Sequence, residues 1–262
     1  MQEIRGAKDS EKAAAPASSA MRSLDRALDV LELLEMAARP LRLTDIAREL
    51  NLPKATTQRI LGTLEAHGRV ERIDGGFATG IASLLGAHAY VKSNRLILAG
   101  RPVLRDLAEE TGYTASLYVR VGYDRAVVAR VEGRVPQRYQ LPIGERLPLH
   151  QGAGKVLVAG MSPDEVDALW ATLDEPRYAS GAVIDRAGFE RDLDAIRAKG
   201  FHYASGERLI GMASIAAPIR DRDGGCLAAV QINGTDADLA GSADELSLAV
   251  RRAADSIGRH LR

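Results

Sequence analysis

Several features that would place a chain in a structural class at once are missing from these 262 residues. The one cysteine, Cys226, has no second thiol to pair with, so no disulfide can form within the chain. Such cysteine usage is typical of a reducing cytosol. No apolar run approaches the roughly 18 residues of a membrane helix, and the N-terminus has no hydrophobic signal core. These absences predict a soluble, cytoplasmic protein without a membrane partner.

An excess of charge of either sign is also missing, because 35 Lys and Arg balance 35 Asp and Glu. A balanced chain has no global field that would attract nucleic acid or a membrane surface. A DNA-binding protein of this composition would have to gather its positive charge in one place. Evidence for or against a nucleic-acid partner must therefore come from local patterns.

A complete phosphate loop is missing from the stretch HQGAGKVLVA at residues 150–159. Glycines and a lysine before an apolar helix suit a phosphate, but the full pattern needs an earlier glycine and a Ser or Thr after the lysine. Leu149 and Val156 occupy those two positions. The pattern argues against a nucleotide hydrolase and leaves the weaker hypothesis of a small-anion site at the helix start. We expect Lys155 to point to solvent.

Groups for catalysis are equally sparse. Cys226 follows two glycines at an expected strand start, with no identifiable base nearby, and a free cysteine is more often a small buried apolar residue. No Cys/His cluster with the spacing of a metal site is present. We therefore expect no catalytic residue, no metal ion and no cofactor.

The N-terminal pattern changes sharply after the first twenty residues. Residues 1–21 are polar and rich in Ala and Ser, without a sustained amphipathic period, so we expect a disordered tail. From Leu24 to Leu34, apolar residues recur every three or four positions. This spacing predicts an amphipathic helix, which should end before Pro40.

Two further helices and a hairpin are expected before residue 80. A short helix is followed by a break at residues 51–53, because proline disfavours helical geometry in the residue before it. A helix over about 54–67 comes next, and then a hairpin with a Gly75-Gly76 turn. Three helices and a hairpin in 22–80 predict a winged helix-turn-helix.

The rest of the chain alternates strands and helices. The stretch 81–95 is mostly helix-compatible and separates two differently patterned regions, which predicts a linker helix. Strand pairs interrupted by helices, without a regular βαβ repeat, favour an α+β domain on an antiparallel sheet over 96–262. The expected helices are 96–110, one from about 152, 162–172, 186–199 and 242–261, and the expected strands are 114–120, 125–132, 137–141, 213–220 and 226–233.

The helix over 54–67 is the candidate for reading DNA, because the second helix of a helix-turn-helix lies in the major groove. Gln58 can pair with adenine edges and Arg59 with guanine or phosphate. The lysine and threonines of the first turns suit phosphates. The candidate contacts are Lys54, Thr56, Thr57, Gln58 and Arg59 on the helix, with Arg69 and Arg72 at the base of the wing.

Two other interpretations of this region stay open. Helix pairs with this period also occur as plain core units, and outward charges usually form a solvated face. A helix-turn-helix can also mediate protein contacts. Nine Lys or Arg stand against eight Asp or Glu between Arg22 and Arg72, so charge does not decide. The helix spacing, the proline turn and the hairpin favour DNA binding.

Four segments in order make the chain recognisable. SLDRALDVLELL and LRLTDIARELNLPKATTQRILGTLEAHGRVER resemble the N-terminal winged helix of the IclR (isocitrate lyase regulator) family of bacterial transcription regulators. LPIGERLPLHQGAGKVLVAG and GFHYASGERLIGMASIAAPIRDRDGG resemble the effector-binding domain of the same family. The resemblance covers about residues 22–260, which makes it far more specific than a helix-turn-helix alone.

The resemblance implies a homodimer or a dimer of dimers in which each chain places one recognition helix on double-stranded operator DNA. A symmetric dimer implies a palindromic operator, because half-site symmetry mirrors protein symmetry. A GAF-like domain at 96–262 would take up a small organic effector, carboxylated or aromatic, that changes operator affinity. The expected role is that of a repressor, and an activator of a catabolic operon with the same architecture is the alternative.

The resemblance also implies which residues line the effector pocket. By the family's pattern they are Leu141, Gly152, Ala153, Met212, Ser214, Ala229, Gln231 and Asn233. Gln231 and Asn233 lie two apart on an expected strand, so both side chains should point to one face. We expect the helix after Gly152 to offer its backbone N–H groups to a polar or carboxylated ligand.

Overall fold

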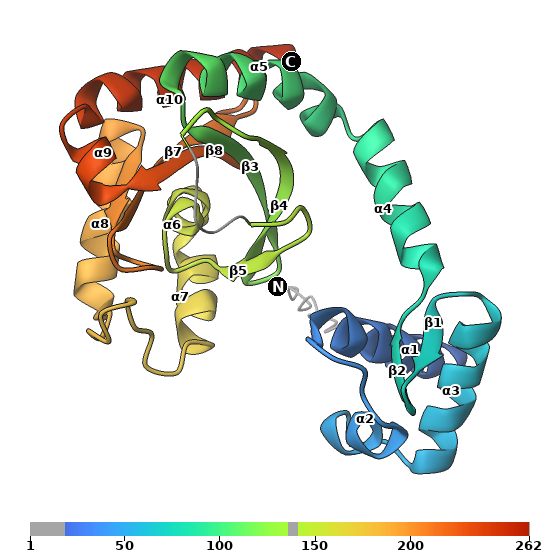
Figure 1. Ribbon diagram of the computed structural model, residues 1–262. Coiled ribbons are helices and arrows are strands. Elements are labelled where there is room, and N and C mark those ends of the chain that lie inside the picture. The colour runs from blue at the N-terminus through green and yellow to red at the C-terminus, as the bar shows by residue number, and fades with distance from the viewer. Residues whose placement is uncertain (1–18, 136–140, 262) are drawn as a thin grey trace, which may run out of the picture. The chain divides into compact units, whose positions relative to one another are not determined.

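The structure is a computed structural model that describes residues 19–135 and 141–261 (Figure 1). The chain forms two compact units, which divide between Tyr90 and Val91. The first consists of helices and a small hairpin, and the second is built on a six-stranded antiparallel sheet with helices. This confirms the predicted α+β class. No helix in the described ranges is long and apolar enough to cross a membrane.

The first unit packs three helices and a two-stranded hairpin around one core. Its helices are α1 (Ser19–Met36), α2 (Leu43–Glu49) and α3 (Lys54–Ala66), and its strands are β1 (Val70–Ile73) and β2 (Gly76–Thr79). Helix α1 begins at Ser19, inside the range predicted as a tail, and residues 1–18 of that prediction lie outside the described residues. The core consists of Val30, Leu34, Ile46, Ile60, Leu61, Val70 and Phe77.

The two turns of this unit have backbone conformations that few residues adopt. Between α2 and α3, Asn51 has a φ of +50°, a left-handed conformation that asparagine tolerates better than most residues. The hairpin turn is formed by Asp74 and Gly75, with φ of +50° and +74°, which is the geometry of a two-residue hairpin loop. The predicted Gly75-Gly76 turn is therefore wrong by one residue, because Gly76 already pairs with Ile73 in the ladder.

Helix α4 (Ile81–Ser93) follows the hairpin, where a linker helix was expected. None of its residues is buried. Ile81, Leu84 and Leu85 are each at least 64% exposed, so the helix carries apolar side chains that nothing in the described chain covers.

The second unit contains six strands and six helices in the described residues. Its helices are α5 (Arg95–Thr111), α6 (Ala153–Val158), α7 (Pro163–Ala171), α8 (Arg186–Lys199), α9 (Asp236–Ala240) and α10 (Ala243–His260). Its strands are β3 (Thr114–Val121), β4 (Asp124–Val131), β5 (Arg146–Pro148), β6 (His202–Ser205), β7 (Met212–Arg220) and β8 (Cys226–Thr235), in the sheet order β5-β4-β3-β8-β7-β6. Strands β5 and β6 and helix α9 were not predicted. Most of the strand expected at 137–141 lies outside the described residues, and Leu141 is not in a strand.

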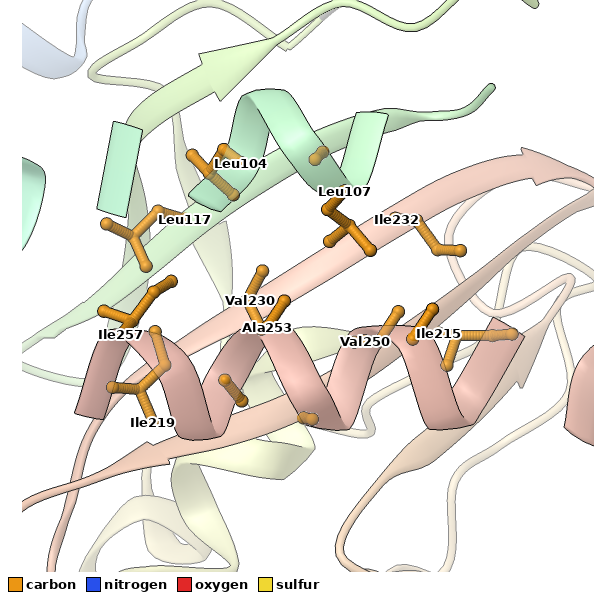
Figure 2. Packing of buried hydrophobic residues seen from close by; sticks show 14 of the residues in the cluster. Leu104, Leu107, Leu117, Ile215, Ile219, Val230, Ile232, Val250, Ala253 and Ile257 are labelled. Atoms are coloured by element: carbon orange, nitrogen blue, oxygen red, sulfur yellow. The ribbon is translucent and has the colours of Figure 1, made fainter. Parts of the chain in front are cut away.

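Helices α5 and α10 lie side by side on one face of this sheet (Figure 1). Figure 2 shows Leu104 of α5 and Ile257 of α10 pointing toward Leu117 and Val230 of the central strands. All four side chains are fully buried. This cluster is the larger core of the unit and covers the sheet on one side.

The opposite face of the sheet carries helix α6, with α7 and α8 packed beyond it. Tyr118, Ala216 and Ala229 supply the sheet side of this second core, and Val156 and Phe189 belong to the helices. Because α6 has only six residues, it covers part of the face and leaves the rest to polar side chains.

Strand register brings those polar side chains together. Gln231 pairs with Ser116 of β3 and with Ala216 of β7, and Asn233 pairs with Ser214 of β7. Residues opposite each other on antiparallel strands share a face, so Gln231, Asn233 and Ser214 point to the α6 side. The expectation that Gln231 and Asn233 share one face is confirmed.

Candidate DNA interface and effector pocket

Helix α3 presents an exposed polar face at its N-terminal end. Lys54, Gln58 and Arg59 are exposed, as the sequence predicts, and the small residues Ala55 and Gly62 lie on the same side. Small side chains between the polar ones allow a partner to approach the helix closely. The face is therefore shaped for contact with a groove.

Thr57, predicted as a DNA contact, lies on the other side of α3 and is fully buried. Its spacing with Ile60 and Leu61 places it on the core stripe, and its hydroxyl donates to the carbonyl of Pro53 at 3.2 Å. The prediction for Thr57 is wrong, because the side chain closes the first turn of the helix. Thr56 is half-buried and lines a surface hollow between α1 and α3.

The two arginines at the base of the wing are exposed, and contacts within the unit position both of them. Arg72 lies 3.3 Å from the Glu65 carboxylate, and its guanidinium lies 4.9 Å from the centre of the Phe77 ring. Arg69 donates to the carbonyl of Ala82 at 3.4 Å. Glu65 therefore offsets part of the positive charge of Arg72.

The second unit contains a pocket of about 50 Å³ on the α6 side of the sheet. Six of the eight predicted effector residues line it, namely Leu141, Gly152, Met212, Ser214, Gln231 and Asn233. The prediction missed the remaining lining residues, Tyr118, Arg125, Ala204, Glu207, Arg208, Leu209 and Ala213. The pocket thus joins strands β3, β4, β6, β7 and β8 with Leu141 of the segment before β5, the loop before α6 and the loop between β6 and β7.

Ala153 and Ala229 do not line the pocket, so these two predictions are wrong. Ala229 is fully buried on β8 and packs in the core with α6, and Ala153 is fully buried in the first turn of α6. The strand and helix periodicities place both methyl groups in the core beneath α6. Gly152, which precedes Ala153, and Gln231, which lies two positions after Ala229, line the pocket instead.

Polar atoms from three different elements converge beside Gly152. The residue has φ +53° and ψ −132°, a conformation that glycine alone adopts readily. A Cβ atom built there would lie 3.6 Å from Arg125 Nη2, 3.6 Å from Gln231 Oε1 and 3.7 Å from Ser214 Oγ. The absence of a side chain at Gly152 therefore leaves a space enclosed by a cation, an amide oxygen and a hydroxyl.

Arg125 is the most deeply buried cation of the pocket wall. It lies on β4, is 3% exposed and donates from Nη1 to the carbonyls of Pro148 and Gln151. Its guanidinium lies 5.5 Å from the centre of the Tyr118 ring. Burial lowers the pKa of Arg125 to about 10, which still keeps the side chain charged at neutral pH.

Lys155 is fully buried, so the expectation that it points to solvent is wrong. Its ammonium lies 2.6 Å from the Glu207 carboxylate and 2.7 Å from that of Asp192, and it donates to the Tyr178 hydroxyl at 3.2 Å. Burial alone lowers the pKa of Lys155, but the two carboxylates outweigh burial and raise it above its ordinary value. The sequence gives no sign of these partners, which lie on other elements.

Glu207 links this buried pair to the pocket. Burial raises the pKa of its carboxyl, but His202, 3.1 Å away, and Lys155 outweigh that effect and hold the pKa at about 2. The second carboxylate oxygen accepts a hydrogen bond from the backbone N–H of Gly152 at 2.7 Å. Glu207 is therefore ionised wherever the protein is folded near neutral pH.

The start of helix α6 has no free N–H group for a ligand. Gly152 donates to Glu207, and Ala153 donates to Gln231 Oε1 at 3.1 Å. The N–H groups of Gly154 and Lys155 donate within the turn, to the carbonyls of Gln151 and Gly152. The small-anion hypothesis for this helix start is therefore wrong, because side chains of the chain itself take the places of the anion.

Of the missed residues, Arg125 gave no local signal in the sequence. It is the second residue of DRAVVARV, next to Asp124 and ahead of the apolar run AVVA, a position at which a charged residue is usually exposed. Glu207 and Arg208 lie in a turn-like stretch, and nothing local distinguishes them from surface residues.

Comparison with known proteins agrees with this two-unit organisation. Residues 23–74 match the family model of the IclR helix-turn-helix domain, and residues 88–259 match that of the bacterial transcriptional regulator IclR C-terminal domain. The chain is 34% identical over 242 residues to the HTH-type transcriptional regulator BhcR of Paracoccus denitrificans, covering 89% of this chain and 86% of that protein. It is 30% identical to the transcriptional repressor IclR of Escherichia coli K12, over 85% and 83% of the two chains.

A solved structure has the same fold. It is an IclR homologue from Microbacterium hydrocarbonoxydans complexed with 4-hydroxybenzoate, and the TM-score is 0.74 at 24% identity, over 92% of this chain and 99% of that one. The matched helix-turn-helix implies DNA binding, and the matched relatives are regulators rather than enzymes. Because the two family models together cover most of the sequence, the chain belongs to the IclR family of bacterial transcription regulators.

Proposed function

We propose that the protein is a repressor whose affinity for operator DNA changes when a small organic effector, carboxylated or aromatic, binds in the pocket beside Gly152. The observation that carries this proposal is the convergence of polar atoms from β4, β7 and β8 on one small space in the second unit, which begins at Val91 and which we call the sensor unit. The relative named a repressor supports the sign of regulation. The homologue solved with 4-hydroxybenzoate supports the class of effector.

The two activities are assigned to separate residues and ranges. Residues 22–80 bind DNA, 81–95 form the linker and 96–262 bind the effector. The proposed DNA contacts are Lys54, Thr56, Gln58, Arg59, Arg69 and Arg72, and the proposed effector contacts are Leu141, Gly152, Met212, Ser214, Gln231 and Asn233. An effector that binds one arrangement of the protein more tightly than another shifts the population toward it and so changes operator affinity.

The protein acts as a homodimer, or a dimer of dimers, on a palindromic operator. Apolar side chains at Met21, Leu24 and Leu28 recur on one side of α1 and are each more than half exposed. Exposed apolar side chains also run along α4 in the same unit. Such surfaces mark protein contacts, and a second copy of the chain would supply the second half-site reader. Light scattering coupled to size exclusion tests this part of the proposal.

Two variants test the division of labour. Arg59→Ala should weaken binding to DNA from upstream of the gene by about 5- to 150-fold, the loss expected for one specific arginine contact, and leave effector binding unchanged. Asn233→Ala should weaken effector binding and leave binding of effector-free protein to DNA unchanged. Gel shifts at several salt concentrations measure the first activity, and calorimetry with 4-hydroxybenzoate measures the second.

Arg222→Ala is the matched control, because Arg222 is exposed in the turn between β7 and β8 and its loss removes one positive charge from the sensor unit. It should bind DNA as the wild type does. Equal effects of Arg59→Ala and Asn233→Ala on both activities would contradict the assignment. If expression of a reporter gene under the operator fell rather than rose when the regulator was deleted, the protein would be an activator instead.

A further inference from the structure

Arg125 is a buried cation that forms no ion pair within the described residues, although the carboxylates of Glu207 and Asp124 oppose the effect of burial on its pKa. Within residues 19–135 and 141–261, no carboxylate lies within ion-pair distance of its guanidinium, and both of its hydrogen bonds go to backbone carbonyls. Removing a charge from water costs several kcal/mol unless an opposite charge and hydrogen bonds compensate. Lys155 is also buried, but it forms ion pairs with two carboxylates, those of Asp192 and Glu207. The two buried cations of this unit therefore differ in their charged partners.

Arg125 lines the pocket, and its Nη2 group is the one placed beside the space at Gly152. Nη1 makes both hydrogen bonds to the carbonyls of Pro148 and Gln151. Nε is buried and has no hydrogen-bond partner. Nη2 makes no hydrogen bond in the described residues and lies 3.6 Å from the position that a Cβ atom of Gly152 would occupy. The Nε and Nη2 N–H groups of an arginine point in parallel, at the spacing of two carboxylate oxygens.

We propose that Arg125 selects the charge of the effector, and that its Nε and Nη2 groups donate two parallel hydrogen bonds to one carboxylate of a small organic acid. The inference rests on the proposed function, because it assigns a role to a residue in the same pocket. The backbone N–H groups of Gly152 and Ala153 at the start of α6 already donate to Glu207 and Gln231, so they are not free for a carboxylate. Arg125 supplies the hydrogen-bond donors for the acid in their place.

The rest of the pocket suits the remainder of such an acid. Ser214 Oγ and Gln231 Oε1 lie beside the same space at Gly152 as Arg125 Nη2, and Leu141 and Met212 supply the apolar part of the pocket wall. The open space of about 50 Å³ is a few water molecules in size, so only a small ligand enters without displacing side chains. Glu207 lines the same space and is ionised, which disfavours a second negative charge on the ligand. A small monocarboxylate fits these conditions.

Two acids and their neutral amides test the proposal on the full-length protein. Sodium propionate and sodium benzoate are titrated by calorimetry at constant ionic strength, alongside propionamide and benzamide, which have the same shape without the charge. At least one acid should bind at least about 30-fold more tightly than its amide, as expected when one partner of a buried charged pair is lost. Amides that bind as tightly as the acids, or two acids that fail to bind, overturn the proposal.

Arg125→Gln should weaken binding of the preferred acid by at least about 30-fold and abolish the preference over the amide. Arg120→Gln is the matched control, because Arg120 lies on the neighbouring strand, is ion-paired with Glu165 and does not line the pocket. Fluorescence of Trp170 reports whether the variants fold. Since Arg125 also binds two carbonyls, Arg125→Lys serves if the Gln variant is unfolded, and it should bind the acid more weakly than wild type because it lacks the two parallel donors.

The outcomes separate this inference from the proposed function. An acid that binds through Arg125 but leaves operator affinity unaltered in gel shifts contradicts the proposed coupling and leaves the role of Arg125 intact. A folded Arg125→Gln protein that still binds the acid as tightly as the wild type overturns the role of Arg125. If that variant also keeps its effector response on DNA, the proposed function stands without it.

Discussion

Replacing Glu207 by Gln should destabilise the sensor unit by about 3 kcal/mol at neutral pH. The Lys155 ammonium is fully buried, 2.6 Å from Glu207 and 2.7 Å from Asp192. Removing one partner of a buried ion pair costs about 3–5 kcal/mol, because it leaves an uncompensated charge. Since Asp192 remains beside Lys155 in the variant, we expect the lower end of that range.

The pKa of Glu207 gives a second, independent value for the stability that its carboxylate contributes. Its pKa is held at about 2 in the folded protein, against an ordinary value of 4.5. A pKa depressed by that much corresponds to about 3 kcal/mol of stability. Because the folded-state pKa is the lower one, this stability is fully present above pH 4.5 and is lost as the pH falls toward 2. At about pH 3, less than half of it remains.

Trp170 makes the measurement specific to the sensor unit. It is the one tryptophan of the chain, lies on α7 and has its ring centre 5.3 Å from that of Phe189. Urea unfolding followed by its fluorescence, at pH 7, 4 and 3, gives the free energy of unfolding of wild type and variant. The difference between them should be about 3 kcal/mol at pH 7 and less than half of that at pH 3.

Glu110→Gln is the matched control, since Glu110 forms an exposed ion pair with Arg252 in the same unit. Exposed pairs contribute less than about 1 kcal/mol, so this variant should unfold close to wild type at every pH. A Glu207→Gln protein as stable as wild type at pH 7 would refute the argument from the buried pair. A difference that stays constant between pH 7 and pH 3 would refute the argument from the pKa.

Two further predictions concern the same unit. Burial raises the pKa of the Cys226 thiol from 9.0 to about 11, so at pH 8 the folded protein should react with a thiol-specific disulfide reagent about 100-fold more slowly than the urea-unfolded protein, and equal rates would contradict this. Gly133→Ala should lower the free energy of unfolding by more than about 2 kcal/mol, because the new methyl group would overlap the backbone of Gly112 and Tyr113, whereas Gly241→Ala, with nothing within 4 Å, should be tolerated.

The longer helices of the second unit could be placed from the sequence where their end signals are local, whereas α9, with only five residues, was missed despite its Thr235 cap. Helix α8 spans Arg186–Lys199, the range predicted, because Asp185 caps its first turn and Gly200 ends it in a left-handed conformation. Strands β5 and β6 were missed because they have three and four residues and lie at the two edges of the sheet. So short a strand has too few positions to show alternation, and its ladder partner sets its place.

The candidate sites divide in the same way. The resemblance to the IclR family implied Gln231 and Asn233 as pocket residues, strand alternation predicted that they share one face, and both line the pocket. The prediction for Thr57 was wrong because adjacent positions on a helix can lie on the exposed face and on the core stripe, and threonine is common in both places. Arg125 and Glu207 were missed because their roles depend on partners that lie more than twenty residues away in the sequence.

The stretch HQGAGKVLVA shows how a local pattern can point to the right chemistry at the wrong atoms. Free N–H groups at the start of α6 would bind an anion, but Glu207 and Gln231, brought from β8 and the loop after β6, already accept from them. The fold thereby fixes its own negative charge beside Gly152, and within the described residues it leaves Arg125 Nη2, beside the same space, and Arg125 Nε without hydrogen-bond partners. In the proposal for Arg125, recognition of an acid depends on one side chain of β4 rather than on the helix backbone. A related chain with an uncharged residue at this strand position and the same two acceptors should keep the fold and lose the preference for an acid.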